Sequence, residues 1–269
     1  MNNQSTNYPR IRQTYQPNIA DTVGTLTESK KLFTKRQKII IATVIMTVGL
    51  IITQNANLLF YRMQFILGLG IMAYLLSLWA LWGEMTKLKA ITLLILPALF
   101  TIAFAGFYFL FSQNRWLTRL PWALGYGFSF YCLLLSQNVF NVASTRTIAL
   151  YRAASTVSFV CTIFTAVLLF NVGFSLNLSF YWNALIALGI TLPLAFQLLW
   201  TVEMEGVNTK LIVTTLLVSF MSGQLAIALS FWPIAHPIWA ISQATALYIM
   251  LGLTVEFWRE RLSNRFVIE

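Results

Sequence analysis

The sequence predicts an all-helical integral membrane protein, a polytopic transmembrane helical bundle of about eight spans. One observation is composition: 58% of the 269 residues are hydrophobic and 10% are charged, against roughly 25% charged residues in an ordinary soluble domain. The other is that the apolar residues are gathered in segments of about 20, the length of helix that crosses a hydrocarbon core of about 30 Å. Together these observations exclude a soluble globular protein.

Eight segments of the chain have this length and character, and most of the connections between them are short. We place them at 39–54, 63–83, 89–111, 121–142, 149–172, 179–202, 210–231 and 238–257. The first is the least well defined, because the sequence TQNANLLFYR that follows it fits either a loop or a continuation of the helix.

The N-terminal residues 1–37 are polar and hold few large apolar side chains, so they cannot bury a core. We therefore expect a disordered basic cytoplasmic tail at 1–37, a helical bundle at 38–258 and a short cytoplasmic tail at 259–269. The basic residues next to the first span are Lys30, Lys31, Lys35, Arg36 and Lys38. This cluster is expected to lie against anionic lipid headgroups, or to act only as a signal for topology.

The basic residues also predict the orientation of the bundle, because short loops rich in Lys and Arg stay on the cytoplasmic side. If the N-terminus is cytoplasmic, all 18 Lys and Arg residues except Arg62, Arg115 and Arg119 lie inside. The nine tryptophans fall at the ends of predicted spans, where amphipathic rings prefer the headgroup level. We expect a multi-pass membrane protein with both termini cytoplasmic.

Two prolines, Pro97 and Pro193, fall near the middle of the third and sixth predicted spans. Each removes a backbone donor and is expected to kink its helix. Their contexts, ILPALF and TLPLAF, are alike, which would suit an inverted repeat with a transport site at broken helices. The alternative is that they are ordinary prolines of membrane helices.

Uncharged polar residues supply the best candidate for a binding surface. The inner set of candidate ligand or partner contacts comprises Gln137, Asn138, Asn141 and Gln197, with Arg146 and Arg152 close by in the sequence. Arginine beside amide groups suits forked contacts to an anionic headgroup, a phosphate or a carboxylate. The alternative is that both arginines only anchor a loop to the headgroups. An outer set comprises Asn171, Asn183, Gln224, His236 and Gln243.

Small residues at helical spacing predict close helix packing. Ser219 with Gly223, and Ala226 with Ser230, share a face of the seventh span. Because small residues also occur in the eighth span, we expect a tight hairpin between the seventh and eighth spans.

Several chemistries are disfavoured by the residues present. Cys132 and Cys161 both lie in apolar segments, which excludes a disulfide scaffold and a cysteine-ligated metal site. His236 is the sole histidine, a thin basis for acid–base catalysis. We expect no catalytic residue, no cofactor and no metal. The basic residues follow no nucleic-acid-binding fold, so no nucleic acid is expected as a partner.

The stretch NVFNVASTRTIALYRAAS at 138–155, followed by an apolar span, resembles a segment of uncharacterised multi-span membrane proteins of reduced-genome bacteria. The resemblance extends over the central half of the chain. It implies a bacterial inner-membrane protein and carries no activity.

These residues are compatible with two functions. The leading interpretation is a non-catalytic membrane subunit or scaffold whose cytoplasmic face binds anionic lipid or a membrane-protein partner, including a second copy of the chain. The alternative is a transporter or lipid-handling protein for a neutral or lipid substrate, in which the two proline kinks open a path lined by Gln137, Gln197, Gln224 and Gln243.

Overall fold

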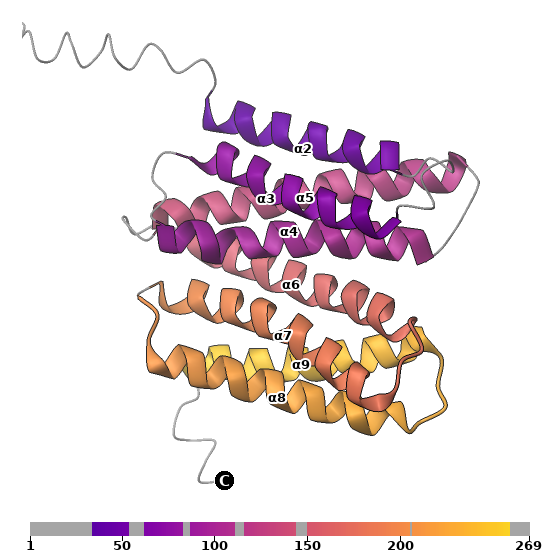
Figure 1. Cartoon of the computed structure of the whole chain (residues 1–269). Coiled ribbons are helices and arrows are strands. Elements are labelled where there is room, and N and C mark those ends of the chain that lie inside the picture. The colour runs from indigo at the N-terminus through magenta and orange to yellow at the C-terminus, as the bar shows by residue number, and fades with distance from the viewer. Residues whose placement is uncertain are drawn as a thin grey trace, which may run out of the picture. The chain divides into compact units, whose positions relative to one another are not determined.

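A computed structural model describes residues 34–53, 62–82, 87–110, 116–143, 150–204 and 206–258. These residues form helices and no strand (Figure 1). The helices are α2 (Lys35–Thr53), α3 (Arg62–Leu81), α4 (Lys87–Leu110), α5 (Trp116–Ala143), α6 (Tyr151–Phe174), α7 (Phe180–Glu203), α8 (Thr209–Ser230) and α9 (His236–Trp258). The predicted spans therefore correspond one to one with helices, and their bounds differ by a few residues at each end.

The predicted fold class, an all-helical membrane bundle of about eight spans, is confirmed. Seven of the eight described helices are long and apolar enough to cross a membrane. The exception is α5, which is 28 residues long but has Gly, Ser, Gln and Asn among its apolar residues. The predicted tails, at 1–37 and 259–269, lie almost entirely outside the described residues.

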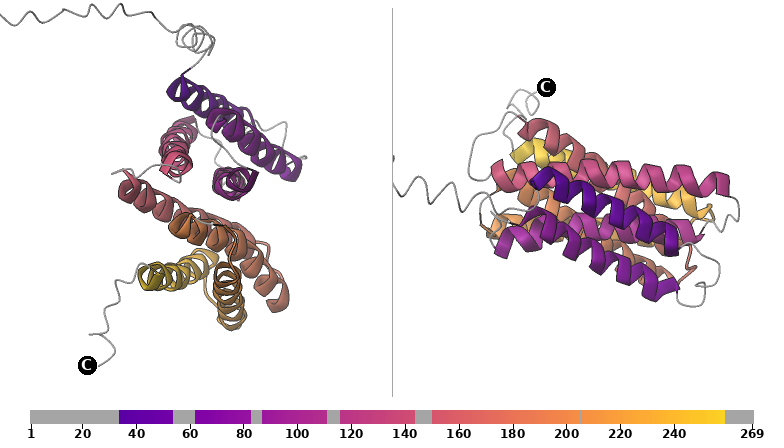
Figure 2. Two further views of the ribbon diagram at one scale, coloured as in Figure 1. Left: turned by 90° about the vertical axis from the view of Figure 1, so that its left-hand side faces the viewer. Right: turned by 90° about the horizontal axis from the view of Figure 1, so that it is seen from above.

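The helices pack largely with their neighbours in the chain, with α6 as the main exception. It contacts α4, α5, α7 and α9, so it joins an N-terminal group (α2–α5) to a C-terminal group (α7–α9), as the left view of Figure 2 shows. The α7–α8 pair has the most extensive contact. We call the end where α2, α4, α6 and α8 begin the inner end; it lies on the left in Figure 1. The sequence predicts that this end is cytoplasmic.

Aromatic side chains fill the middle of the N-terminal group. The rings of Phe100, Phe104, Tyr126 and Phe130 are buried and in mutual contact, with centroid separations of 4.8 to 5.9 Å. Large apolar side chains such as Phe128 instead point outward and are exposed. An apolar exterior around a packed interior is the arrangement expected of a bundle surrounded by lipid.

Polar side chains near the middle of the bundle are hydrogen-bonded to one another. The hydroxyls of Thr101 and Tyr126 are 2.9 Å apart and join α4 to α5. The hydroxyls of Thr191 and Ser222 are 2.8 Å apart, and the Gln243 amide donates to the Ser222 carbonyl at 2.7 Å and to its hydroxyl at 2.8 Å. The second network joins α7, α8 and α9, which is how polar groups hold helices together in lipid.

Helix α8 contacts α9, but it contacts α7 more extensively, so the closest packing of α8 is with α7 and not, as we expected, with α9. A Cβ added at Gly223 would lie 3.5 Å from the Ala184 carbonyl oxygen and 3.8 Å from Leu188 Cβ. The absent side chain lets the α8 backbone approach α7, and α9 contacts α8 less extensively. The link between α8 and α9 is made by Gln243 instead.

Pro97 and Pro193 both lie inside continuous helices, in α4 and α7 respectively. The hydroxyl of Thr101 donates to the Pro97 carbonyl at 2.9 Å, one turn further along α4. The kinks themselves stay a prediction, as does the inverted repeat.

Candidate functional site

Polar residues gather at the inner end of five helices, and we call them the inner polar cluster. Its members come from the last turns of α3, α5 and α7 and from the first turns of α4 and α6. They are Ser77, Lys89, Gln137, Asn138, Asn141, Tyr151, Ser158, Gln197, Trp200, Thr201 and Glu203. Most of them are buried, although every helix in the cluster is otherwise apolar.

Near the surface, the cluster ties α3, α4 and α5 together. The ammonium of Lys89 donates to the Asn141 carbonyl at 3.2 Å, and the Asn141 amide donates to the Leu81 carbonyl at 3.3 Å. Both side chains are buried. The carbonyls at the ends of α3 and α5 have no partner within their helix, so these bonds satisfy groups that lipid would leave unpaired.

A second contact ties α6 to α5 and α7. The Tyr151 hydroxyl donates to the Thr201 carbonyl at 2.9 Å, and its ring meets that of Phe140 edge to face with centroids 5.8 Å apart. Tyr151 is the first residue of α6. It therefore fixes the start of α6 against the last turn of α7.

Below these contacts lies a layer of polar groups that have no hydrogen-bond partner among the described residues. Neither amide atom of Gln137 or Gln197 is bonded, and the Ser158 hydroxyl is not bonded either. Each residue lies six or seven positions from the inner end of its helix, a depth of about 10 Å. Buried polar groups are nearly always paired. This layer is therefore where a water molecule or a ligand is expected.

Two further buried polar atoms at the inner end of α7 have no partner within the described part of the chain. They are the indole nitrogen of Trp200 and one carboxylate oxygen of Glu203. The sequence predicts Trp200 as an interfacial anchor, but its side chain is almost completely buried. The reason is that α7 contacts four other helices, α4, α6, α8 and α9, which leaves little of its inner end open to lipid.

The structure places the predicted ligand or partner contacts in different environments. Gln137, Asn141 and Gln197 face the interior, and the side-chain oxygen of Asn138 is also buried. Arg152 is exposed on the first turn of α6. Arg146 lies outside the described residues. The amides and the described arginine therefore do not form one surface.

A basic groove lies on the edge of the inner end formed by α2 and α3. The Lys38 ammonium lies 5.4 Å from the centre of the Trp79 ring. The groove has a volume of about 350 Å³ and is lined by Lys38, Leu75, Leu78, Trp79 and Trp82. We call it the α2–α3 groove. Lys35 and Arg36 precede Lys38 on α2, whereas Lys30 and Lys31 lie outside the described residues.

The outer polar set serves mainly to connect helices. The Asn183 amide donates to the Ser230 hydroxyl at 3.0 Å, which joins α7 to α8. The ring of His236 bonds the Asn177 side-chain oxygen at 2.8 Å. Gln224 is exposed, whereas Gln243 is buried and bonded. Of the four glutamines proposed to line a transport path, three are therefore buried and Gln224 is exposed.

Across the described residues, no group of three His, Cys, Asp or Glu side chains is placed to hold a metal ion. Cys132 and Cys161 are both free thiols. No family model matches the chain, and no curated protein and no solved structure shows a significant similarity to it. The chain is a polytopic helical membrane protein.

Proposed function

We propose that the protein is a non-catalytic membrane subunit or scaffold whose inner end binds anionic phospholipid. The observation that carries this proposal is the α2–α3 groove, in which the Lys38 ammonium lies over the Trp79 ring. Tryptophan rings prefer the headgroup level of a bilayer, so the cation is held where phosphate and glycerol groups of lipids lie. Leu75 and Leu78 provide an apolar wall for an acyl chain.

The filled middle of the bundle supports a scaffold over a transporter. The aromatic rings around Phe100 and Tyr126 occupy the centre of the N-terminal group, and the polar groups beside them are bonded to one another. A path for a solute would have to displace this packing. The exposed basic side chains at the inner end, among them Arg36, Arg152 and Lys210, add to its attraction for anionic headgroups, by about 1 kcal/mol each.

The test measures retained lipid by native mass spectrometry. The full chain is purified and exposed to equal amounts of phosphatidylglycerol and phosphatidylcholine with the same acyl chains. We expect wild type to retain phosphatidylglycerol preferentially, and Lys38→Gln to lower that retention about fivefold. Lys210→Gln is the matched control, because it removes an inner-end cation that stacks on Trp258 and lies outside the groove.

An equal loss in both variants would show that total charge matters and that the groove does not. The alternative outcome is a second polypeptide retained from the native membrane in stoichiometric amount. If Arg146→Ala with Arg152→Ala released it, the inner end would bind a protein partner and not a lipid. No preference for phosphatidylglycerol in wild type would end the proposal.

Transport of a neutral substrate is the second candidate function, and one observation favours it. The amides of Gln137 and Gln197 are fully buried at similar depth and have no partner among the described residues. A substrate with hydroxyl or amide groups would satisfy them. On this hypothesis Pro97→Ala and Pro193→Ala fold normally and abolish flux in liposomes, whereas unchanged flux would exclude the kink mechanism.

A further inference from the structure

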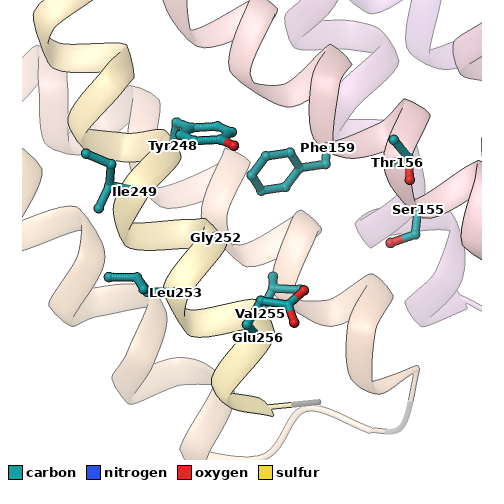
Figure 3. Close-up of a pocket in the computed structure, with 9 residues that line it drawn as sticks. All are labelled: Ser155, Thr156, Phe159, Tyr248, Ile249, Gly252, Leu253, Val255 and Glu256. Atoms are coloured by element: carbon teal, nitrogen blue, oxygen red, sulfur yellow. The ribbon is translucent and has the colours of Figure 1, made fainter. Parts of the chain in front are cut away.

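A second groove lies between α6 and α9 on the opposite group of helices, and we call it the α6–α9 groove (Figure 3). Its volume is about 470 Å³. Its polar end is formed by Ser155, Thr156 and Glu256, and its apolar end by Phe159 and Tyr248. The groove therefore has the amphipathic character of a lipid molecule.

The length and depth of the groove fit a lipid of one leaflet. Glu256 lies two residues from the inner end of α9, and Tyr248 lies eight residues deeper, a distance of about 12 Å along the helix. Half of a hydrocarbon core is about 15 Å thick. The groove thus runs from the headgroup level through most of one leaflet, which suits an acyl chain better than a small soluble molecule.

The walls of the groove leave room for that chain. Gly252 lies midway along the α9 wall, and a Cβ added to it would meet nothing within 4 Å. At the deep end the rings of Phe159 and Tyr248 meet edge to face, with centroids 5.5 Å apart, and bridge α6 and α9. The acyl chain of the lipid would lie over Gly252 and end at the Phe159–Tyr248 pair.

The charges at the inner end select the headgroup. Glu256 is half-buried and forms no ion pair within the described part of the chain. A carboxylate at the edge of the hydrocarbon is costly unless a cation or hydrogen-bond donor accompanies it. Arg152 lies on the same face of α6 as Thr156 and Phe159, one turn closer to the inner end. The carboxylate suits an ammonium, and the guanidinium suits the neighbouring phosphate.

We propose that the α6–α9 groove binds a phospholipid whose headgroup carries a primary ammonium. The Glu256 carboxylate accepts hydrogen bonds from the N–H groups of this ammonium, and Gly252 leaves space for the acyl chain. A quaternary headgroup has no N–H to donate, and an anionic headgroup would be repelled by the carboxylate. The groove therefore discriminates among headgroups that share the same phosphate and the same chains. This site is separate from the α2–α3 groove, and the charged residue in its lining is Glu256, where the α2–α3 groove has Lys38.

The experiment is a lipid competition on the full chain, read by native mass spectrometry. Phosphatidylethanolamine and phosphatidylcholine with identical acyl chains are supplied in equal amounts. We expect wild type to retain phosphatidylethanolamine over phosphatidylcholine by about tenfold, the size of one charge-assisted hydrogen bond. Lys38→Gln should leave this ratio unchanged, which separates the result from the binding of anionic lipid.

Two variants locate the binding. Glu256→Gln keeps the shape of the side chain and should bring the ratio close to one. Gly252→Leu fills the groove and should remove the retained phosphatidylethanolamine. The control is Gly68→Leu, which adds the same side chain at another glycine with no atom within 4 Å of its Cβ and should bind like wild type.

Three results would overturn the proposal. The first is equal retention of both lipids by wild type. The second is an unchanged ratio in Glu256→Gln. The third is an unchanged amount of phosphatidylethanolamine in Gly252→Leu, because the headgroup contact would then exist without the groove.

Discussion

The middle of the bundle and its inner end differ in the hydrogen bonding of their buried polar groups. In the middle, two polar pairs are hydrogen-bonded across helices, Thr101 with Tyr126 and Ser222 with Gln243. At the inner end, the amides of Gln137 and Gln197 are equally buried and have no partner in the described chain. The first arrangement holds helices together. The second leaves polar groups without a hydrogen-bond partner in the described part of the chain.

The largest expected effect comes from adding volume to the filled middle. A Cβ at Gly127 of α5 would lie 2.7 Å from the Thr47 hydroxyl oxygen on α2, so Gly127→Leu must push α2 away. We expect a loss of about 3 kcal/mol in the free energy of unfolding, measured by denaturant titration in detergent micelles.

The control for this prediction lies on the same helix. Gly125 has open space at its Cβ position, so Gly125→Leu should unfold at the wild-type denaturant concentration. If both variants are equally stable, the seam between α2 and α5 is not tightly packed and the described middle is looser than we infer.

A smaller loss is expected when a polar link in the middle is removed. Gln243→Leu keeps the volume of the side chain but removes both bonds to Ser222. Hydrogen bonds between membrane helices contribute about 1 kcal/mol, so the free energy of unfolding should fall by about that amount. A variant as stable as wild type would show that the network joining α7, α8 and α9 contributes nothing.

The same substitution at the inner end should not lower the free energy of unfolding, and its effect should be the smallest of those predicted. Gln137→Leu and Gln197→Leu replace unpaired buried amides by apolar groups of similar size, a change that is nearly neutral or slightly stabilising. Thermal unfolding of the two variants beside Gln243→Leu measures this difference directly. A loss like that of Gln243→Leu would mean that bound water already satisfies these amides, and the contrast between the two regions would disappear.

The helices were predictable from the sequence because the length and apolar character of a membrane helix are imposed by the bilayer. The polar residues of the inner polar cluster were partly predictable for the same reason, since Gln137 and Gln197 interrupt otherwise apolar segments. Their direction was not predictable. Whether an amide faces lipid, headgroups or another helix depends on which helices pack beside it.

The direction of the Lys89 side chain was not predictable from the sequence either. At a helix end, a lysine normally extends to the headgroups, and the sequence places it among the cytoplasmic bases. In the fold its ammonium is buried and bonds the Asn141 carbonyl. The α6–α9 groove was also beyond sequence reasoning, because its walls are separated by two intervening helices and no local pattern pairs them.

The composition of α5 has a consequence for how the protein is made. Gly, Ser, Gln and Asn interrupt the apolar residues of this helix, which packs against α2, α4 and α6. Helices that partition poorly into lipid need polar partners within the membrane. Two of those neighbours precede α5 in synthesis, and α6 follows it. We therefore expect α5 and α6 to enter the bilayer as a pair, which then packs against helices that are already inserted.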